Sequence, residues 1–336
     1  MKFLSKQHLK DKAGQTCLLR INLDIKDPAK ESSRITAVIP TIKLLLDNGI
    51  KIIILSHRGR PRPEDGSQIN QKSEFSLKPL IDILFQKLPP IYGSLTSIDW
   101  VENLRFDPRE QKNDDGFARE LASRGDFYVN DDFATSHRVV ASLVAITKYL
   151  PSYAGLLLEK EVVTLSRAME NPERPLVLII GGEKIDDKVG MIKNFSERAD
   201  YFLMGSAYAG IRNQESGIKD FDSKVIFPED FIEEDGRKLD IGPKTVKKYM
   251  EIISQAKTII WNGPLGQCEE PRYADGSKKI AEAIIESKAF SVVGGGDTQQ
   301  FLAGLGRENE FSFISTGGGA MLEFLAGKKL PALDML

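Results

Sequence analysis

Short apolar runs rich in β-branched residues alternate along the chain with longer segments that have the period of a helix. The apolar runs predict strands at residues 17–22, 51–55, 127–129, 176–180, 201–204, 224–227, 258–261, 290–293 and 311–315. Strands that alternate with helix-length segments are typical of α/β proteins. We therefore predict mostly parallel sheets that are covered by helices on both faces.

Two of the predicted helices have clear boundaries in the sequence. Between residues 41 and 47, apolar side chains repeat on one helical face, with Pro40 just before the stretch and Asn48-Gly49 as a stop signal after it. A second helix is predicted at 155–169, ahead of the proline-containing segment 171–175 that opens a new series of strands. Because 336 residues also exceed the usual size of one domain, we predict two domains.

Composition excludes several classes of protein. The chain carries 46 basic and 48 acidic side chains, a formal net charge of -2, which indicates neither a nucleic-acid nor a membrane partner. No apolar run approaches the roughly 18 to 20 residues that cross a bilayer, and the residues after Met1 do not build a secretion signal. With only Cys17 and Cys268, no disulfide framework is expected. We expect a cytoplasmic protein.

Basic side chains gather just after the predicted strands of the first half. In open α/β sheets, ligands bind beyond the carboxyl ends of the strands. The basic residues in or beside these positions are Arg34, His57, Arg58, Arg60, Arg105, His137 and Arg138. Guanidinium groups hold carboxylates and phosphates with paired hydrogen bonds, so the group suits a small polyanionic substrate. Any one arginine taken alone could equally be an ordinary surface residue.

Glycines occupy the same position after strands in the second half. They lie in the segments 181–184, 294–298 and 316–319. Glycine lets the backbone approach an anion, and the start of the following helix favours phosphate. A single Gly-Gly pair is more often a turn, but three such segments in one half favour a phosphate site.

Charged residues in these segments extend the hypothesis. Asp297 is a candidate ligand for Mg²⁺, which combines one or two carboxylates with substrate phosphates. Lys184 and Lys188 would share a helix face if a helix begins near Gly182, and either could meet a transferring phosphoryl group. The chain has no G-x-G-x-x-G dinucleotide motif, P-loop or G-x-S-x-G motif, which argues against a dehydrogenase, a P-loop enzyme or an ordinary hydrolase.

Many of these residues fall in ordered strings. The strings are Arg20-Ile21-Asn22-Leu23-Asp24, Ser33-Arg34-Ile35, Pro40-Thr41-Ile42, Ser56-His57-Arg58-Gly59-Arg60-Pro61, Glu102-Asn103-Leu104-Arg105-Phe106, Tyr128-Val129-Asn130-Asp131, Ser136-His137-Arg138, Trp261-Asn262-Gly263-Pro264, 294–298 and 315–320. In this order, from about residue 10 to the C-terminus, the chain resembles phosphoglycerate kinases.

The resemblance implies two Rossmann-like domains joined by a hinge helix. It places a phosphoglycerate-binding domain at 1–154, the helix at 155–170, a nucleotide-binding domain at 171–312 and a returning C-terminal segment at 313–336. It implies reversible, Mg²⁺-dependent phosphoryl transfer in glycolysis between 1,3-bisphosphoglycerate with ADP and 3-phosphoglycerate with ATP. It also implies a monomer whose domains close for the transfer.

The resemblance also assigns roles by position. Phosphoglycerate would be held by Asn22, Asp24, Arg34, His57, Arg60, Arg105 and Arg138, to which we add His137 from the basic group. Nucleotide would be held by Lys188, Asn262, Pro264, Glu269, Gly295, Gly296, Asp297 and Thr298, with Glu269 at the ribose and Asp297 at the metal. Arg34, Lys184 and the helix start with Gly317 and Gly318 would stabilise the phosphoryl group in transfer. Because the acceptor carboxylate is already ionised, positioning and charge carry the rate without a general base.

The chain departs from the family pattern at both expected sites. Asn22 and Asp24 exchange the usual order of Asp and Asn, and Glu183 replaces an alanine next to Lys184. A carboxylate that points at a phosphate site without a partner is unfavourable by several kcal/mol. The exchange leaves open a kinase for another small phosphorylated carboxylate.

The segments that normally surround the base are also reduced. Only Gly205 remains of a glycine run after 201–204, the segments between 210 and 224 and between 231 and 240 are short, and Lys238 replaces a glycine. An active kinase with a less selective nucleotide pocket is the leading hypothesis. A non-catalytic relative that binds phosphoglycerate or nucleotide and a trimmed design of the family remain open.

Overall fold

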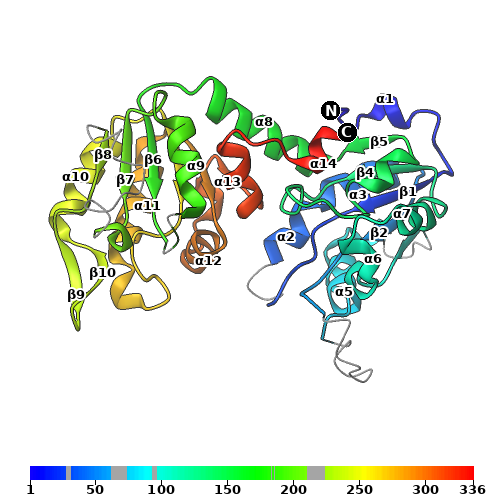
Figure 1. The fold of residues 1–336 in the computed structure, drawn as a ribbon, viewed down its shortest axis with the longest axis horizontal. Helices are drawn as coiled ribbons and strands as arrows, with labels where there is room; N and C mark the ends of the chain where they lie inside the picture. The colour runs from blue at the N-terminus through cyan, green and yellow to red at the C-terminus, as the bar shows by residue number, and fades with distance from the viewer. Residues whose placement is uncertain (28–31, 62–73, 93–96, 183, 185, 210–223) are drawn as a thin grey trace. The chain divides into compact units, whose positions relative to one another are not determined.

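The chain folds into two units with separate sheets and cores (Figure 1). The computed structural model describes residues 1–27, 32–61, 74–92, 97–182, 184, 186–209 and 224–336. Contacts assign Met1–Glu161 and Lys329–Leu336 to the first unit and Val162–Lys328 to the second. The predicted α/β class with two parallel-sheet domains is confirmed, whereas the finer domain limits stay a prediction.

The first unit is built on a five-stranded parallel sheet. Its strands are β1 (Thr16–Arg20), β2 (Lys51–Leu55), β3 (Ile98–Trp100), β4 (Phe127–Asn130) and β5 (Ser152–Ala154), in the order β3-β2-β1-β4-β5. In the centre, Arg20 of β1 pairs with Leu55 on one side and Asn130 on the other. The residues that follow these three strands therefore meet at one edge of the sheet.

Helices cover both faces of this sheet because successive residues of a strand point to opposite sides. Cys17 and Leu19 pack in the core that includes α2 (Ser32–Ala37), α3 (Ile39–Asp47) and α5 (Lys78–Lys87), whereas Leu18 packs with α7 (Asp115–Ala122). Shorter elements complete the unit: α1 (Lys6–Leu9), η1 (Pro90–Tyr92), η2 (Leu104–Phe106), α6 (Pro108–Gln111), η3 (Ala145–Lys148) and α14 (Pro331–Asp334). As predicted, Pro40 lies in the first turn of α3, and Asn48 ends it.

The second unit has a six-stranded parallel sheet. Its strands are β6 (Leu176–Ile180), β7 (Tyr201–Met204), β8 (Val225–Ile226), β11 (Thr258–Asn262), β12 (Phe290–Gly294) and β13 (Phe313–Ile314), in the order β13-β12-β11-β6-β7-β8. Every residue of β6 and β11 is buried, as expected for strands covered on both faces. Asn262 pairs with Ile180 and Gly294, so the loops that follow β6, β11 and β12 start side by side.

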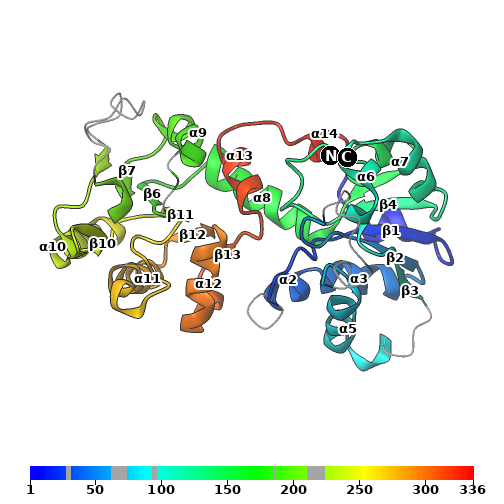
Figure 2. The same cartoon turned by 60° about the horizontal axis from the view of Figure 1, so that its bottom comes forward.

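Two helix layers enclose this second sheet (Figure 2). The layer on the side of Val177, Ile179 and Trp261 consists of α10 (Pro243–Ile253), α11 (Asp275–Ser287) and α12 (Gly296–Leu305). On the other side, α9 (Asp186–Phe195) packs with α13 (Gly319–Leu325). The 3-10 turns are η4 (Ser206–Tyr208), η7 (Pro271–Tyr273) and η8 (Glu308–Glu310).

Helix α8 (Leu156–Glu170) carries the division between the units, which falls after Glu161. Its start is fixed by Asp131, whose Oδ1 accepts hydrogen bonds from the amides of Leu157 and Leu158 at 2.9 and 3.0 Å. The predicted helix at this position is confirmed, and its hinge role stays a prediction. In the described part of the chain, none of the helices combines the length and the apolar character that a bilayer crossing requires.

The sequence analysis missed four short strands. β3 and β5 have three residues each and lie at the two edges of their sheet, so they lack a long apolar run. β9 (Phe231–Glu234) and β10 (Arg237–Ile241) form an antiparallel hairpin, and Asp235-Gly236 supplies its turn with positive φ angles of 51° and 73°. An Asp-Gly pair between strands is a strong hairpin signal that could have been used.

Candidate active site

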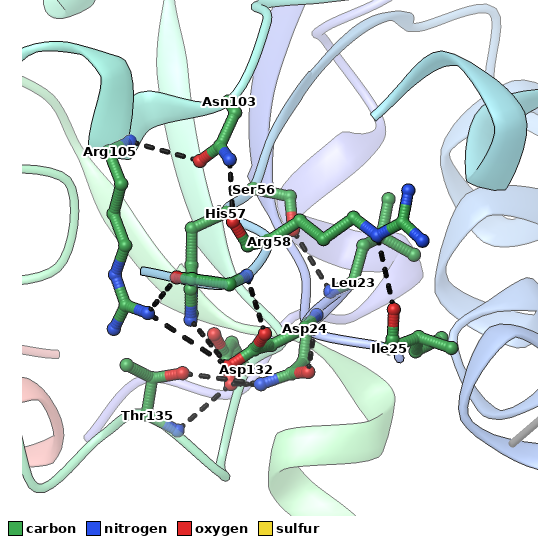
Figure 3. Close-up of polar contacts among 12 residues, drawn as sticks. Leu23, Asp24, Ile25, Ser56, His57, Arg58, Asn103, Arg105, Asp132 and Thr135 are labelled. Atoms are coloured by element: carbon green, nitrogen blue, oxygen red, sulfur yellow. Dashed lines mark hydrogen bonds and ion pairs between the residues drawn. The ribbon is translucent and has the colours of Figure 1, made fainter. Parts of the chain in front are cut away.

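In the first unit, several predicted substrate residues surround Asp24 (Figure 3). Its Oδ1 accepts a hydrogen bond from the Gly59 amide at 2.8 Å, and its Oδ2 lies 3.5 Å from His57 Nε2 and 3.9 Å from Arg105 Nη1. Burial alone raises the pKa of Asp24, but the hydrogen bonds from His57 and Gly59 and the positive charge of Arg105 outweigh it and lower this pKa from 3.8 to about 2. Asp24 is therefore an anion among basic groups.

Asn22 points away from this group. Its Nδ2 donates to Asp132 Oδ1 at 3.1 Å and to Thr135 Oγ1 at 3.3 Å, while its Oδ1 accepts from the Asp24 amide at 3.1 Å. Arg34 donates to the Asp24 carbonyl at 3.3 Å. Because the order is exchanged, the carboxylate of Asp24 lies beside His57 and Arg105. The side-chain amide of Asn22 contacts Asp132 and Thr135 instead.

A buried arginine that the sequence analysis did not single out supports His57. Arg20 is 1% exposed; its Nη2 lies 2.7 Å from His57 Nδ1 and its Nη1 lies 2.8 Å from Asp132 Oδ2. A guanidinium group can only donate, so His57 Nδ1 accepts and the ring proton lies on Nε2, which faces Asp24. Burial lowers the pKa of His57 below 6.5, which leaves the ring neutral at pH 7.

A second buried carboxylate completes this network. Glu110 is 1% exposed and accepts from the hydroxyl and amide of Ser142 at 2.7 and 3.0 Å, while that hydroxyl accepts from Arg20 Nε at 3.1 Å. Burial raises the pKa of Glu110, and the charge of Arg20 acts against this rise. The available signal was a charged residue, Arg20, at the end of the apolar run 17–19.

Three predicted substrate residues are less closely tied to Asp24. Arg60 and Arg138 have exposed side chains, and His137 is half-buried. Burial lowers the pKa of Arg105, and the nearby charges of Arg20 and Arg60 contribute to this shift. The amide of Arg138 donates to the carbonyl of Thr135 at 2.8 Å. Substrate binding by these three side chains, as by the residues around Asp24, stays a prediction.

In the second unit, a cavity of about 460 Å³ opens beyond the ends of β6, β11 and β12. The predicted residues in its wall are Lys184, Lys188, Asn262, Pro264, Glu269, Gly295, Gly296, Asp297, Thr298 and Gly318. We call it the phosphate cavity. Gly317 is buried next to it, and its amide donates to Ser315 Oγ at 3.0 Å.

Backbone packing explains why glycines are needed at this cavity. A Cβ atom on Gly263, whose φ is +89°, would lie 2.2 Å from the carbonyl oxygen of Gly181. The Gly263 amide donates to Thr298 Oγ1 at 3.0 Å, and the Gly182 amide donates to the Pro264 carbonyl at 2.8 Å. The loops after β6, β11 and β12 are therefore bonded together into one wall with little side-chain bulk.

The phosphate cavity has positive charge and a hydrogen-bond donor available for a ligand. Lys188 is 6% exposed, and burial lowers its pKa although Asp187 and Asp297 act in the opposite direction. The buried Nδ2 of Asn262 has no hydrogen-bond partner among the described residues. Because buried polar groups are normally hydrogen-bonded, this donor indicates a place for an anionic oxygen.

The structure corrects one expectation about the two lysines. Helix α9 begins at Asp186, so Lys184 precedes the helix and does not share a helix face with Lys188. The two are linked differently, because Lys188 Nζ donates to the Lys184 carbonyl at 3.1 Å. Glu183 lies outside the described residues.

The carboxylates that line the phosphate cavity are candidate ligands for Mg²⁺. Within the described residues, no group of three or more His, Cys, Asp or Glu side chains could hold a metal ion by itself. Asp297, Asp187 and Glu269 line the phosphate cavity. Since Mg²⁺ at phosphate sites takes one or two carboxylates together with phosphate oxygens and waters, these residues fit a metal that binds with a nucleotide.

Known proteins place the chain in a family. The family model described as phosphoglycerate kinase matches residues 8–219 and 211–328. Phosphoglycerate kinases from Finegoldia magna and Dictyoglomus turgidum are 36% and 37% identical, and the alignments cover 99% and 97% of this chain and 99% and 96% of those proteins. The first alignment extends over 399 positions, more than the 336 residues of this chain, so that relative has insertions that this chain lacks.

Solved structures agree with the sequence relatives. Phosphoglycerate kinase from Coxiella burnetii has a TM-score of 0.83 at 30% identity, covering 99% of this chain and 98% of that one. Phosphoglycerate kinase from Pyrococcus horikoshii OT3 also has a TM-score of 0.83 at 30% identity, covering 100% of this chain and 98% of that one. The chain is therefore a phosphotransferase that belongs to the phosphoglycerate kinase family, as its sequence motifs predict.

Proposed function

We propose that this chain binds phosphoglycerate at the basic group around Asp24 and a Mg-nucleotide in the phosphate cavity, and transfers a phosphoryl group between them. The observation that carries the proposal is the phosphate cavity. Its wall combines two lysines, the unpartnered buried donor of Asn262 and glycine backbone from separate strand ends. These are the groups that a polyphosphate requires.

In the direction that consumes ATP, a carboxylate oxygen of 3-phosphoglycerate forms a bond to the γ-phosphorus. The bond from that phosphorus to the bridging oxygen of ADP breaks, and ADP leaves with the electron pair. No proton is transferred, so the protein has to align the groups and neutralise their charge. Lys184 and Lys188 would neutralise the phosphates, and Mg²⁺, when bound beside Asp297, supplies further positive charge there.

In the first unit, substrate binding combines cations with a fixed hydrogen-bond pair. Arg34, Arg60, Arg105 and Arg138 supply the positive charge for the carboxylate and phosphate. The neutral ring of His57 holds its Nε2 proton towards Asp24. An ionised Asp24 can accept a hydrogen bond from a substrate hydroxyl, which favours a hydroxy acid over a ligand with only anionic oxygens.

Further parts of the proposal rest on the family resemblance. We propose that the enzyme is a cytoplasmic monomer, that its partners are the small-molecule substrates, and that the units close around them with α8 as the hinge. Phosphoryl transfer also requires the exclusion of water, since water would compete as the acceptor.

The test is steady-state turnover of the purified chain with Mg-ATP and 3-phosphoglycerate, coupled to reduction of the acyl phosphate. We expect turnover that depends on both substrates, and a second arm with GTP measures base selectivity. Binding of both substrates without turnover would favour the non-catalytic alternative. Turnover with a different phosphorylated hydroxy acid and none with 3-phosphoglycerate would favour an altered substrate.

A further inference from the structure

A buried aspartate of the second unit, Asp240, lies outside the phosphate cavity wall and has no part in the reaction described above. It belongs to β10 and is 1% exposed. Its Oδ2 accepts a hydrogen bond from the Gly276 amide, in the first turn of α11, at 2.8 Å. Its Oδ1 accepts from the Ile241 amide, also at 2.8 Å. Each oxygen of the carboxylate therefore faces a backbone N–H group.

The Asp240 carboxylate also packs against the segment 264–269, which follows β11. A Cβ atom on Gly266 would lie 2.3 Å from Asp240 Oδ1, and a Cβ atom on Gly276 would lie 2.6 Å from the same oxygen. Glycine at both positions lets the two backbones approach the carboxylate. Asp240 therefore contacts the segment 264–269 and the start of α11 at the same time.

Two further hydrogen bonds hold the segment 264–269 from either side. The Gln267 amide donates to the Leu239 carbonyl of β10 at 2.8 Å. The Leu265 amide donates to Ser277 Oγ of α11 at 2.8 Å. Leu239 and Ser277 are the chain neighbours of Asp240 and Gly276, so the link between these two residues fixes both attachment points of the segment.

The segment forms part of the phosphate cavity. Pro264, Gly266, Gln267 and Glu269 line this cavity. The Pro264 carbonyl also accepts from the Gly182 amide on the opposite part of the wall at 2.8 Å. A shift of the segment would therefore change the shape of the wall that faces the ligand.

We propose that Asp240 is a positioning residue for the nucleotide: its ionised carboxylate holds the segment 264–269 in the arrangement that binds the nucleotide, and its protonation weakens that binding. The inference rests on the proposed nucleotide binding in the phosphate cavity. It adds a residue that acts on this site through the backbone without touching the ligand.

Protonation disturbs the arrangement because of its hydrogen-bond geometry. A carboxylate can only accept, whereas a carboxylic acid carries one O–H donor. Since both oxygens of Asp240 face backbone donors, the added proton meets an N–H group or forces the side chain to turn. Either response loosens the link between β10 and α11.

The surroundings of Asp240 bring this titration close to neutral pH. Burial raises the pKa of Asp240 to about 6, against its hydrogen bonds from the backbone; the charge of Asp275 adds to the rise, and that of Lys279 opposes it. Cys268 of the segment also lies near Asp240, and burial raises its pKa to about 11, which keeps the thiol neutral below pH 8. The change in nucleotide affinity is therefore expected between about pH 7 and pH 5.

Asp240→Asn provides the first test. Asparagine has nearly the same shape but sets an NH₂ donor against one of the backbone amides, as the protonated acid does. By calorimetry, the variant is expected to bind Mg-ADP about 10-fold more weakly than the unaltered chain at pH 7.5, the effect of one unsatisfied buried hydrogen bond. At pH 5 the difference should shrink to about 2-fold, because Asp240 is then itself mostly protonated.

The ratio of the two affinities cancels the titration of the ADP phosphates, which is common to both proteins. The KM for 3-phosphoglycerate, which is proposed to bind in the first unit, should not change. A ratio that is the same at both pH values would indicate a merely structural role and overturn the proposal.

Asp275→Asn provides a second test that does not depend on the folding of Asp240→Asn. Asp275 is exposed, and its charge raises the pKa of Asp240. Its removal should leave Mg-ADP affinity at pH 7.5 unchanged and move the fall in affinity to lower pH by about 0.3 pH units, the effect of one exposed charge. Glu286→Gln is the matched control, because Glu286 is an exposed carboxylate near the end of the same helix. A fall in affinity that Asp275→Asn does not move would assign the titration to another group.

The outcomes separate this inference from the proposed function. If the unaltered chain does not bind Mg-ADP at pH 7.5, the proposed nucleotide binding fails and the inference fails with it. If the unaltered chain binds Mg-ADP and Asp240→Asn, shown by thermal unfolding to be folded, binds it equally well at both pH values, the inference alone is overturned.

Discussion

The groups around Asp24 in the first unit are bonded mainly to one another, whereas those of the phosphate cavity in the second unit leave capacity for a ligand. In the first unit, Arg20 holds His57 and Asp132, and Asp24 accepts from Gly59. In the second, the buried Asn262 Nδ2 has no partner among the described residues, and the phosphate cavity lies open beside it. Both sites lie at the carboxyl ends of parallel strands, so strand position alone does not set this difference.

The difference predicts that substitutions at the two sites affect stability and activity in different ways. Paired groups orient a substrate with little rearrangement, and removing one leaves a buried partner uncompensated. Groups that wait for an anion carry a desolvation penalty in the free protein, which the ligand relieves. Substitutions in the first unit should therefore lower the free energy of unfolding, whereas substitutions in the phosphate cavity should lower activity and leave stability intact.

The largest effect on stability is expected for Arg20→Met. The substitution leaves the buried carboxylates of Asp132 and Glu110 without the guanidinium, at an expected loss of about 3–5 kcal/mol in the free energy of unfolding. Urea unfolding measures the loss, and hydrogen exchange should locate it in β1 and β4. Arg124→Met is the control, because that arginine is exposed and its ion pair within the described residues is with Glu120 at 3.9 Å. A loss as small as that of the control would mean that the Arg20 network is not needed for stability.

Lys184→Ala should give the largest effect on activity. If Lys184 stabilises the transferring phosphoryl group, turnover at saturating substrate should fall about 100- to 1000-fold, while nucleotide binding changes much less. Lys193→Ala is the control, because Lys193 is exposed on the nearby α9 and outside the cavity wall. Equal losses in binding and in turnover would contradict a role specific to the transition state.

Asp297→Ala tests the proposed metal position. Loss of one carboxylate ligand should raise the Mg²⁺ concentration for half-maximal turnover by about 10-fold, because affinity depends on the ligand charge count. Asp275→Ala is a suitable control, since Asp275 is an exposed aspartate of α11 that forms an ion pair with Lys279. An unchanged Mg²⁺ titration would remove Asp297 from the metal site.

The exchanged residue Asp24 should show a smaller effect. Asp24→Asn replaces the charged acceptor of the substrate hydroxyl by a neutral amide, so phosphoglycerate should bind about 5-fold more weakly, as measured by calorimetry. Because the folded pKa of Asp24, about 2, lies below its usual 3.8, its ionised form stabilises the fold above pH 4. That contribution is lost as the pH falls through 2, and Asp24→Asn should lack this part of the acid transition. Tighter binding of phosphoglycerate by the variant, most marked at low salt, would mean that repulsion by the Asp24 charge outweighs its role as an acceptor.

These sites differ in how far the sequence predicts them. The apolar runs predict β6 and β11, and the glycine-containing segments that follow these strands line the cavity, because residues next to a strand end in the sequence also lie beside it in the fold. Arg20 was missed because its partners Asp132 and Ser142 are 112 and 122 residues away in the chain. Only the folded sheet brings them together, and no local pattern marks an arginine as buried.

The remaining misses have local causes. The Asp235-Gly236 turn was a visible signal for the hairpin, and it was passed over because the flanking segments are polar. The start of α9 at Asp186 was placed too early because glycine after a strand does not by itself fix where a helix begins.

Lys188→Met gives the smallest expected change in stability and the sharpest contrast with Arg20→Met. Burial lowers the pKa of Lys188 from its usual 10.5, so the folded chain holds this proton less tightly than the unfolded chain. The resulting penalty is present below the lowered pKa and is relieved as the pH rises towards 10.5. Methionine has no such penalty, so Lys188→Met should raise the free energy of unfolding at pH 7 by about 1 kcal/mol or less and flatten its rise at alkaline pH. Urea unfolding between pH 7 and pH 10 measures the stability, and calorimetry measures Mg-ADP binding. A gain in stability with a loss of nucleotide binding supports the contrast between the two sites. A loss of stability like that of Arg20→Met would show that the two sites are built alike.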